Sequence, residues 1–273
     1  MFSNTPIQSL VDAGIGYASM QTYVTVMVAL VIVMTVLDMM HKKSAQYFFE
    51  STKKAEKNAT KSVSKGSILV QTVVTDVVLS GEFHNQTRRL VHLLTMYGFI
   101  AFNATTAMMI FGENAADATL NTVWHTGALS LFIGSWWFWF VFKVDVAAEG
   151  NAWTNIEIKR DMFSLSLMAT STAALGWSLT GAGTGVWFII VILATASLFG
   201  GVYWSKFAHM FFKPAAAFNK RVVHADGSNE NLPEDIDLNS PATHERFPDI
   251  PQYMGKNPEN MGLGIKREEP KHY

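Results

Sequence analysis

Five long apolar stretches alternate with polar segments along the chain. An α-helix needs about 20 mostly apolar residues to cross the hydrocarbon core of a bilayer, which is about 30 Å thick. In lipid the backbone must satisfy its own hydrogen bonds, so such stretches are expected to be helical. They lie at residues 22–40, 90–111, 123–144, 162–179 and 186–207. The pattern therefore predicts an all-α integral membrane protein built on a five-helix transmembrane bundle.

The basic residues indicate which way the spans run. Lys and Arg are absent from residues 1–21, 112–121 and 181–185, whereas each of the alternating segments between these carries them. Cytoplasmic loops are the ones enriched in Lys and Arg. We therefore expect the N-terminus outside, the C-terminus in the cytoplasm, and a multi-pass location in the inner (cytoplasmic) membrane of the cell.

The same pattern divides the chain into parts. Residues 68–80 place apolar side chains at helical spacing and are expected to lie along the membrane surface. The C-terminal part has too few apolar residues for a core of its own, which is typical of a docking segment or of an extension without a role. The parts are an extracytoplasmic N-terminus (1–21), a first span (22–40), a basic cytoplasmic loop (41–88), a four-span bundle (89–212) and a cytoplasmic docking tail (213–273).

Composition narrows the chemistry. Charged residues make up 16% of the chain and the net charge is -1, so there is no basic excess of the kind that nucleic-acid-binding proteins carry. The chain contains no Cys, which excludes disulfides, thiolate zinc sites and Cys-ligated iron–sulfur clusters. A redox centre in this chain must therefore use His, Met or carboxylate ligands.

Two histidines stand at the cytoplasmic ends of different spans. His92 lies near the start of the second predicted span and His209 at the end of the fifth, so both are expected at the same shallow depth. Imidazoles from two facing helices can hold haem iron, so the pair predicts one b-type haem with His92 and His209 as its metal ligands. Arg89 and Lys206 stand beside them and are expected to pair with the haem propionates. The alternative is that both histidines are interfacial side chains.

A third histidine lies on the opposite side of the predicted membrane. His125 is at the outer start of the third span, where it is expected to bind a second, outer haem or a quinone, although no second outer His completes a pair. Small residues at Gly98, Gly200 and Gly201 would let a flat ring approach the helices. Alternatively, they serve only to pack helices together.

The two histidine motifs resemble those of the respiratory nitrate reductase gamma-subunit family, which includes the cytochrome b subunit of heterodisulfide reductase. The residues that carry the resemblance are Arg88-Arg89-Leu90-Val91-His92 and the His-x-x-x-x-Pro motif that runs from His209 to Pro214. Within that family the small size and the lack of Cys are most similar to the membrane anchors associated with dissimilatory adenylylsulfate reductase.

The resemblance implies a membrane subunit with no substrate-level catalytic residues. Such a subunit would transfer electrons between a cytoplasmic flavo-iron–sulfur oxidoreductase, for example adenylylsulfate reductase, and the quinone pool. The family pattern has two histidines on each of two helices, whereas this chain has one on each, so the resemblance implies the inner haem and not the outer one. The alternative from another class is a haem-free membrane anchor or assembly protein for a soluble redox enzyme. A transporter is disfavoured because the chain shows no inverted repeat.

Overall fold

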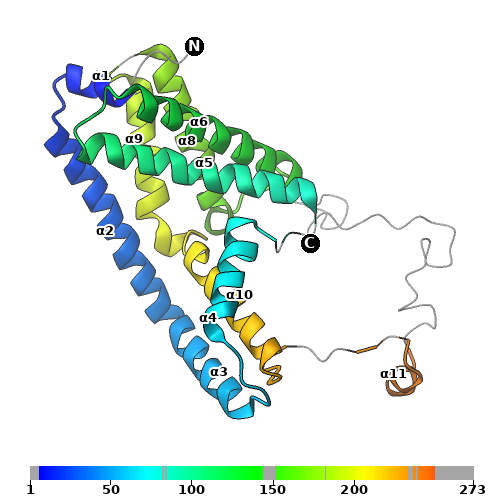
Figure 1. Cartoon of the computed structure of the whole chain (residues 1–273). Helices are drawn as coiled ribbons and strands as arrows, with labels where there is room; N and C mark the ends of the chain where they lie inside the picture. Colours follow the sequence, from blue (N-terminus) through cyan, green and yellow to red (C-terminus); the bar gives the residue numbers. More distant parts are fainter. Residues whose placement is uncertain are drawn as a thin grey trace.

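The computed structural model describes residues 6–81, 83, 85–143, 152–181, 183–232, 236–237 and 239–249, and the regular structure within them is entirely helical (Figure 1). The predicted all-α class is therefore confirmed for the described part of the chain. A helix covers each of the five apolar stretches. These helices are α2 (Tyr17–Lys42), α5 (Gln86–Phe111), α6 (Ala118–Trp137) continued by the π-helix η2 (Phe138–Phe142), α8 (Ile158–Thr180) and α9 (Val186–Gly200).

Shorter elements flank these helices at both ends of the molecule. One short helix, α1 (Pro6–Asp12), precedes α2 and packs near the far end of α5. The remaining elements are α3 (Ser44–Asn58), α4 (Lys65–Thr72), the π-helix η1 (Val73–Val78), the 3-10 turn η3 (Val202–Trp204), α10 (His209–Ala225) and α11 (Pro241–Arg246).

The predicted five-helix bundle is only partly what the structure shows. Among the described helices, α2 and α5 are long and apolar enough to cross a membrane, whereas α9 is apolar but has only 15 residues. The fifth stretch is short because α9 ends at Gly200 and the chain turns through η3 before it resumes as α10. Figure 1 also shows α2 running away from the α5–α6 pair toward α3, rather than alongside that pair.

Close approach of backbones holds α5 against α6. A Cβ atom on Gly98 of α5 would lie 2.5 Å from the backbone nitrogen of Leu131 and 2.9 Å from the carbonyl oxygen of Gly127 on α6. Gly127 in turn has no room for a Cβ against the Phe102 nitrogen, at 2.7 Å. The glycines therefore allow a helix–helix contact that any side chain would prevent. Of the two roles considered for Gly98, approach of a flat ring or packing of helices, the structure shows packing.

A third helix is attached to this pair through polar contacts and buried rings. Trp136 of α6 donates its indole N–H to the Thr172 hydroxyl of α8 at 3.0 Å. At the N-terminal end of the molecule, Trp124 and Trp177 are almost fully buried in one apolar cluster. At the other end, Leu131, Leu198 and Phe207 belong to a second cluster. The four helices α5, α6, α8 and α9 thus contribute to two apolar clusters, one at each end of the molecule.

The part of the chain assigned to the cytoplasm forms a layer of its own. Arg221 of α10 makes a bidentate ion pair with Asp76 of η1, with both N···O distances 2.8 Å. Hydrogen bonds from Arg221 lower the pKa of the Asp76 carboxyl although burial opposes this. Beyond α10 the chain returns to the end of α3, where the Asp226 carbonyl accepts from the backbone N–H groups of Thr60 and Lys61.

These contacts change the expected boundary of the tail. Residues 213–225 belong to α10, and Lys54 of α3 pairs with Glu230 at 2.6 Å, so the first part of the predicted tail is folded onto the basic loop. The reason is that Val222 and Val223 are buried, which a count of apolar residues along the whole tail does not reveal. Residues 250–273 of the tail lie outside the described residues.

A buried ion pair closes the connection between η2 and α8. Lys143 and Asp161 lie 3.0 Å apart, and each side chain is only 4% exposed. The Lys143 ammonium also lies 3.7 Å from the centre of the Trp139 ring and donates to the Asn155 carbonyl at 3.2 Å. Burial raises the pKa of Asp161, but hydrogen bonds from Arg160, the Glu157 N–H and Lys143 outweigh it and lower the pKa from 3.8 to about 2.

We expect Gly98→Ala to destabilise the protein by about 1–3 kcal/mol, because the added methyl group meets the backbone of α6. Gly66→Ala is the matched control, since a Cβ at Gly66 of α4 meets nothing within 4 Å. The measurement is thermal unfolding of both variants in the same detergent. Equal midpoints for the two variants would contradict the close packing of α5 on α6.

We expect Asp161→Asn to cost about 3 kcal/mol near neutral pH, because it leaves the buried Lys143 charge without its partner. The folded-state pKa of Asp161 is depressed, so its contribution is present above about pH 4 and is lost as the pH falls through about 2. The gap in unfolding temperature between wild type and variant should therefore shrink over that range. Glu157→Gln, at an exposed carboxylate of the same segment, should leave stability nearly unchanged.

Candidate functional site

His92 lies one and a half turns into α5 and is held by the segment that leads into that helix. Its Nδ1 atom is 3.0 Å from the Ser80 hydroxyl, and Ser80 is fully buried with a left-handed backbone at φ +49°. The Phe83 ring lies 4.8 Å from the imidazole, centre to centre. α5 begins at Gln86 because the Asn85 side chain accepts from the Arg88 N–H as an N-cap.

His209 is the first residue of α10 and is oriented by its own turn. Its Nδ1–H donates to the Lys206 carbonyl, and the Phe163 ring of α8 packs edge-on against it at 5.5 Å. A carbonyl can only accept, so Nδ1 carries the proton and Nε2 carries the lone pair. This tautomer is the one in which a histidine ligates a metal through Nε2.

The structure places both histidines at the same end of the molecule. Phe83, which contacts His92, also lies 5.9 Å from the Lys213 ammonium of α10. Lys213 follows His209 by one helical turn, so the Phe83 ring links the surroundings of the two histidines. The Arg88 guanidinium is 5.9 Å from the same ring. The pairing of His92 with His209 on one iron stays a prediction.

The two basic residues expected beside the haem have different environments. Arg89 donates from Nε to the Leu79 carbonyl at 2.7 Å and so ties the end of η1 to the start of α5. The Lys206 side chain is exposed, while its carbonyl oxygen orients His209. Arg89 and Lys206 are thus each three residues before the histidine with which they were predicted to act. Arg89 also holds η1 against α5 through the Leu79 carbonyl.

His125 is a buried histidine whose ring nitrogens are both engaged. Nδ1 donates to the Asn121 carbonyl at 2.7 Å, so Nε2 accepts from the Ser178 hydroxyl of α8 at 2.5 Å. The side chain therefore joins α6 to α8 and would have to break the Ser178 bond before it could ligate a metal. A cavity of about 180 Å³ beside it is lined by Thr122, Thr126 and Leu129, all on α6.

Aromatic side chains fill the core next to His209. Phe207 contacts Phe99, Phe163 and Phe199 with ring centres 5.6–6.4 Å apart. Gly98, one residue before Phe99, is covered by the backbone of α6. These contacts show that the small residue at Gly98 packs helices, and that apolar rings surround the His209 side of the candidate site.

No haem-binding site is evident in the part of the chain that the structure describes, so the bis-histidine haem stays a prediction. Each imidazole has a hydrogen-bond partner at Nδ1, which is the arrangement that fixes a metal-ligating ring. Within the described residues no cluster of three or more His, Asp or Glu gathers as a metal site, and a haem held by two histidines would not require one.

Sequence reasoning missed the residues that orient the histidines. Ser80, Phe83 and Phe163 were not identified, because nothing in the sequence places a serine twelve residues upstream against the His92 ring. The contact of His209 with the Lys206 carbonyl could have been predicted from their i, i+3 spacing, since a carbonyl at that spacing faces the ring in a helical turn. His84, which is expected to take no part in holding the haem, lies outside the described residues.

Comparison of the chain with family models, curated proteins and solved structures returned no match.

Proposed function

We propose that this protein is a multi-pass membrane subunit of a redox complex, a b-type cytochrome that passes electrons between a cytoplasmic flavo-iron–sulfur oxidoreductase and the quinone pool. The observation that carries the proposal is the orientation of His92 and His209 at one end of the molecule, each with Nδ1 hydrogen-bonded. The motif resemblance supports the same function and favours adenylylsulfate reductase as the partner. The substrate chemistry then belongs to the partner.

The residues of the chain have distinct tasks in this function. His92 and His209 would hold the iron, while the Ser80 hydroxyl and the Lys206 carbonyl keep the two rings in place. Arg89 and the Lys206 ammonium would balance the charge of the propionates. Haem b, when bound, supplies a one-electron redox centre between the two-electron chemistry of the partner and that of quinone.

Five membrane crossings are part of the proposal. Helices lie over all five apolar stretches, and Lys and Arg alternate between the connecting segments. The short helix α9 is continued by η3 and the start of α10, which together with tilt lets the fifth stretch reach the cytoplasmic surface. The N-terminus is then outside, and α3, α4 and α10 are in the cytoplasm.

The absence of Cys makes this topology directly testable by single-cysteine labelling. Ala116→Cys, in the exposed turn between α5 and α6, should react with a membrane-impermeant maleimide in intact spheroplasts. Lys57→Cys, exposed on α3, should react only after the membrane is opened. Labelling of Lys57→Cys in sealed spheroplasts would overturn the orientation.

The haem is tested by the visible spectrum of the purified protein. We expect a reduced-minus-oxidised b-type α-band in wild type and its loss in His92→Ala and in His209→Ala, because either change removes one of the two residues that would hold the haem iron. Ser80→Ala should weaken haem affinity about 10–100-fold, since it removes the partner that orients His92. Size-exclusion profiles equal to wild type establish that the variants are folded.

His41→Ala is the matched control, because His41 lies at the end of α2, where it faces Tyr203 at 6.1 Å. It should keep the full α-band. Wild-type protein without an α-band, or two ligand variants that retain it, would exclude the cytochrome.

A second candidate function is a haem-free membrane anchor for the same kind of enzyme. The observation that favours it is the dense packing near His209, where Phe99, Phe163 and Phe207 occupy the core and Gly98 is covered by α6. Under this function the two histidines serve only to fix the loop before α5 and the start of α10. The same spectrum separates the two functions.

A further inference from the structure

One face of the helix α3 is covered by the chain itself. Ser51 and Ala55 are buried on this side, and the Asn231 amide donates to the Ser51 hydroxyl at 2.8 Å. The Glu230 carboxylate pairs with Lys54 at 2.6 Å. The start of the predicted tail therefore lies along this inner face of α3.

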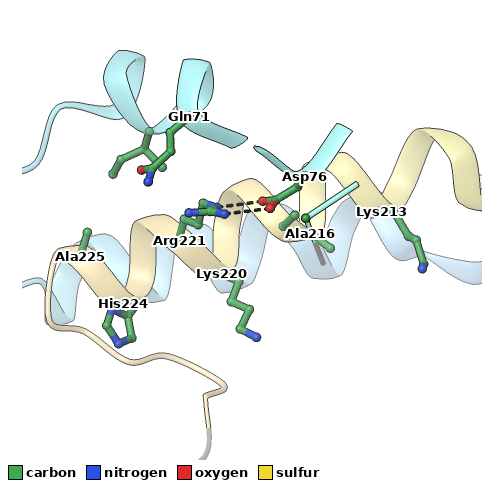
Figure 2. A pocket seen from close by; sticks show the side chains of 11 residues that line it. Gln71, Asp76, Lys213, Ala216, Lys220, Arg221, His224 and Ala225 are labelled. Atoms are coloured by element: carbon green, nitrogen blue, oxygen red, sulfur yellow. Dashed lines mark hydrogen bonds and ion pairs between the residues drawn. The ribbon is translucent and has the colours of Figure 1, made fainter. Parts of the chain in front are cut away.

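The inner face of α3 is also tied to α10. The Thr52 hydroxyl donates to the Asn219 side chain of α10 at 3.4 Å. Two residues further along α10, Arg221 makes the bidentate contact with Asp76 of η1 that Figure 2 shows as a pair of dashed lines. α3 is thus held against α10, which is held against η1, so the side of α3 that faces away from them has a fixed direction.

That opposite side, the outer face of α3, carries Phe49, Lys53 and Lys57. They follow one another at intervals of four residues, which places them on one side of the helix. Phe49 is 62% exposed, and both lysines are exposed as well. An aromatic side chain surrounded by charged groups is a typical anchor of a protein–protein interface.

The acidic residues of α3 do not neutralise this face. Glu56 pairs with Lys65 of α4 at 2.5 Å, whereas Glu50 accepts a hydrogen bond from a neutral glutamine one turn earlier at 2.8 Å. Within the described residues neither lysine of the outer face forms an ion pair, and Lys61 is exposed just past the end of the helix. Three lysines therefore stand beside one carboxylate that has no ion pair, so the outer face favours an acidic partner.

The position of α3 favours a protein partner over the lipid surface. α3 follows α2 after the single residue Lys43, and Figure 1 shows it continuing away from the bundle beyond the end of α2. At a rise of about 1.5 Å per residue, the 15 residues of α3 carry its far end about 22 Å past α2. Salt screens exposed charges over about 8 Å. In the proposed orientation Lys57 is thus beyond the reach of charge on the membrane.

We propose that the outer face of α3 is the docking surface for an acidic region of the cytoplasmic oxidoreductase, with Phe49 entering an apolar site on the partner and Lys53 and Lys57 pairing with carboxylates around it. An apolar centre with a charged rim is the usual anatomy of such an interface. The docking surface then belongs to the basic loop, and the described start of the predicted docking tail supports it from the inner face. The proposal rests on the proposed function for its partner and its orientation.

The test uses the full chain in phosphatidylcholine nanodiscs, which carry no net lipid charge, and purified adenylylsulfate reductase as the probe. Biolayer interferometry gives Kd at low salt and at about 1 M salt, where charges are screened within about 3 Å. Phe49→Ser should raise Kd about 30-fold at both salt concentrations, as expected for an interface anchor. Lys53→Gln/Lys57→Gln should raise it about 10-fold at low salt and leave it unchanged at high salt, because these charges lie at the rim.

The chain offers a matched control for each variant. Tyr47 is 65% exposed on the same helix but is turned about 160° away from Phe49, so Tyr47→Ser should bind the probe as wild type does. Lys159→Gln/Lys220→Gln removes the same charge from exposed positions of α8 and α10 and should also bind as wild type. Circular dichroism spectra equal to wild type establish that all four variants are folded.

Four results would overturn the docking surface. Wild type that does not bind the probe, or outer-face variants that bind it as tightly as wild type, would remove it. Equal losses in the two lysine variants would reduce it to general surface charge. A blue shift of an environment-sensitive fluorophore attached at Lys57→Cys, seen when phosphatidylglycerol is added to the nanodiscs, would place the face on lipid.

Failure of the proposed function would appear in other measurements. A wrong orientation is detected by the cysteine labelling, and a missing haem by the visible spectrum. The binding assay depends on neither, because both faces of a nanodisc are open to the probe.

Discussion

The close approach of α5 and α6 is the constraint on which the rest of the structure depends. Gly98 and Gly127 let the two backbones touch, and this leaves α6 free to hold α8 through Trp136 and His125. α5 in turn carries His92 near its start. The candidate site is thus attached to the most rigidly packed pair of helices, whereas the His209 side depends on the turn that follows α9.

Polar contacts connect α5 to the layer formed by η1 and α10 at two places. Ser80 and the Leu79 carbonyl hold His92 and Arg89 at the start of α5, while Asp76, a few residues earlier, holds α10 through Arg221. The segment between η1 and α5 therefore contacts both candidate histidine regions. Its residue Ser80, which has a positive φ, is fully buried and contacts His92. A change in this layer is well placed to affect the site, whether the protein carries electrons or anchors an enzyme.

Charged residues in this chain are arranged by depth. Lys143 and Asp161 are both 4% exposed at the end of the bundle, where each would be costly alone. Asp38, which is buried on α2, is paired with Lys42 one turn away. Lys213 and Lys220, on α10, are exposed. The buried Asp38, Lys143 and Asp161 are therefore paired within one turn of a helix or across one connection.

Much of the architecture could be predicted from the sequence. The apolar runs predicted helices at five places, and a helix lies over each of them in the described residues. The orientation that the alternation of Lys and Arg indicates stays a prediction. The absence of Cys restricted any redox centre to His, Met or carboxylate ligands. Local spacing placed His92 near the start of a helix, which α5 confirms. His209, expected at the end of the fifth span, is instead the first residue of α10, because α9 ends at Gly200.

Only the tertiary structure decided how these elements are used. The sequence could not show that Gly98 contacts α6 rather than a cofactor, or that His125 is satisfied by Asn121 and Ser178, because both depend on which helices become neighbours. The contact between the folded start of the tail and η1 likewise joins Arg221 to Asp76, which are 145 positions apart in the sequence. Periodicity reports the face of one helix, whereas a site requires the mutual placement of several, and that is set by packing across the whole chain.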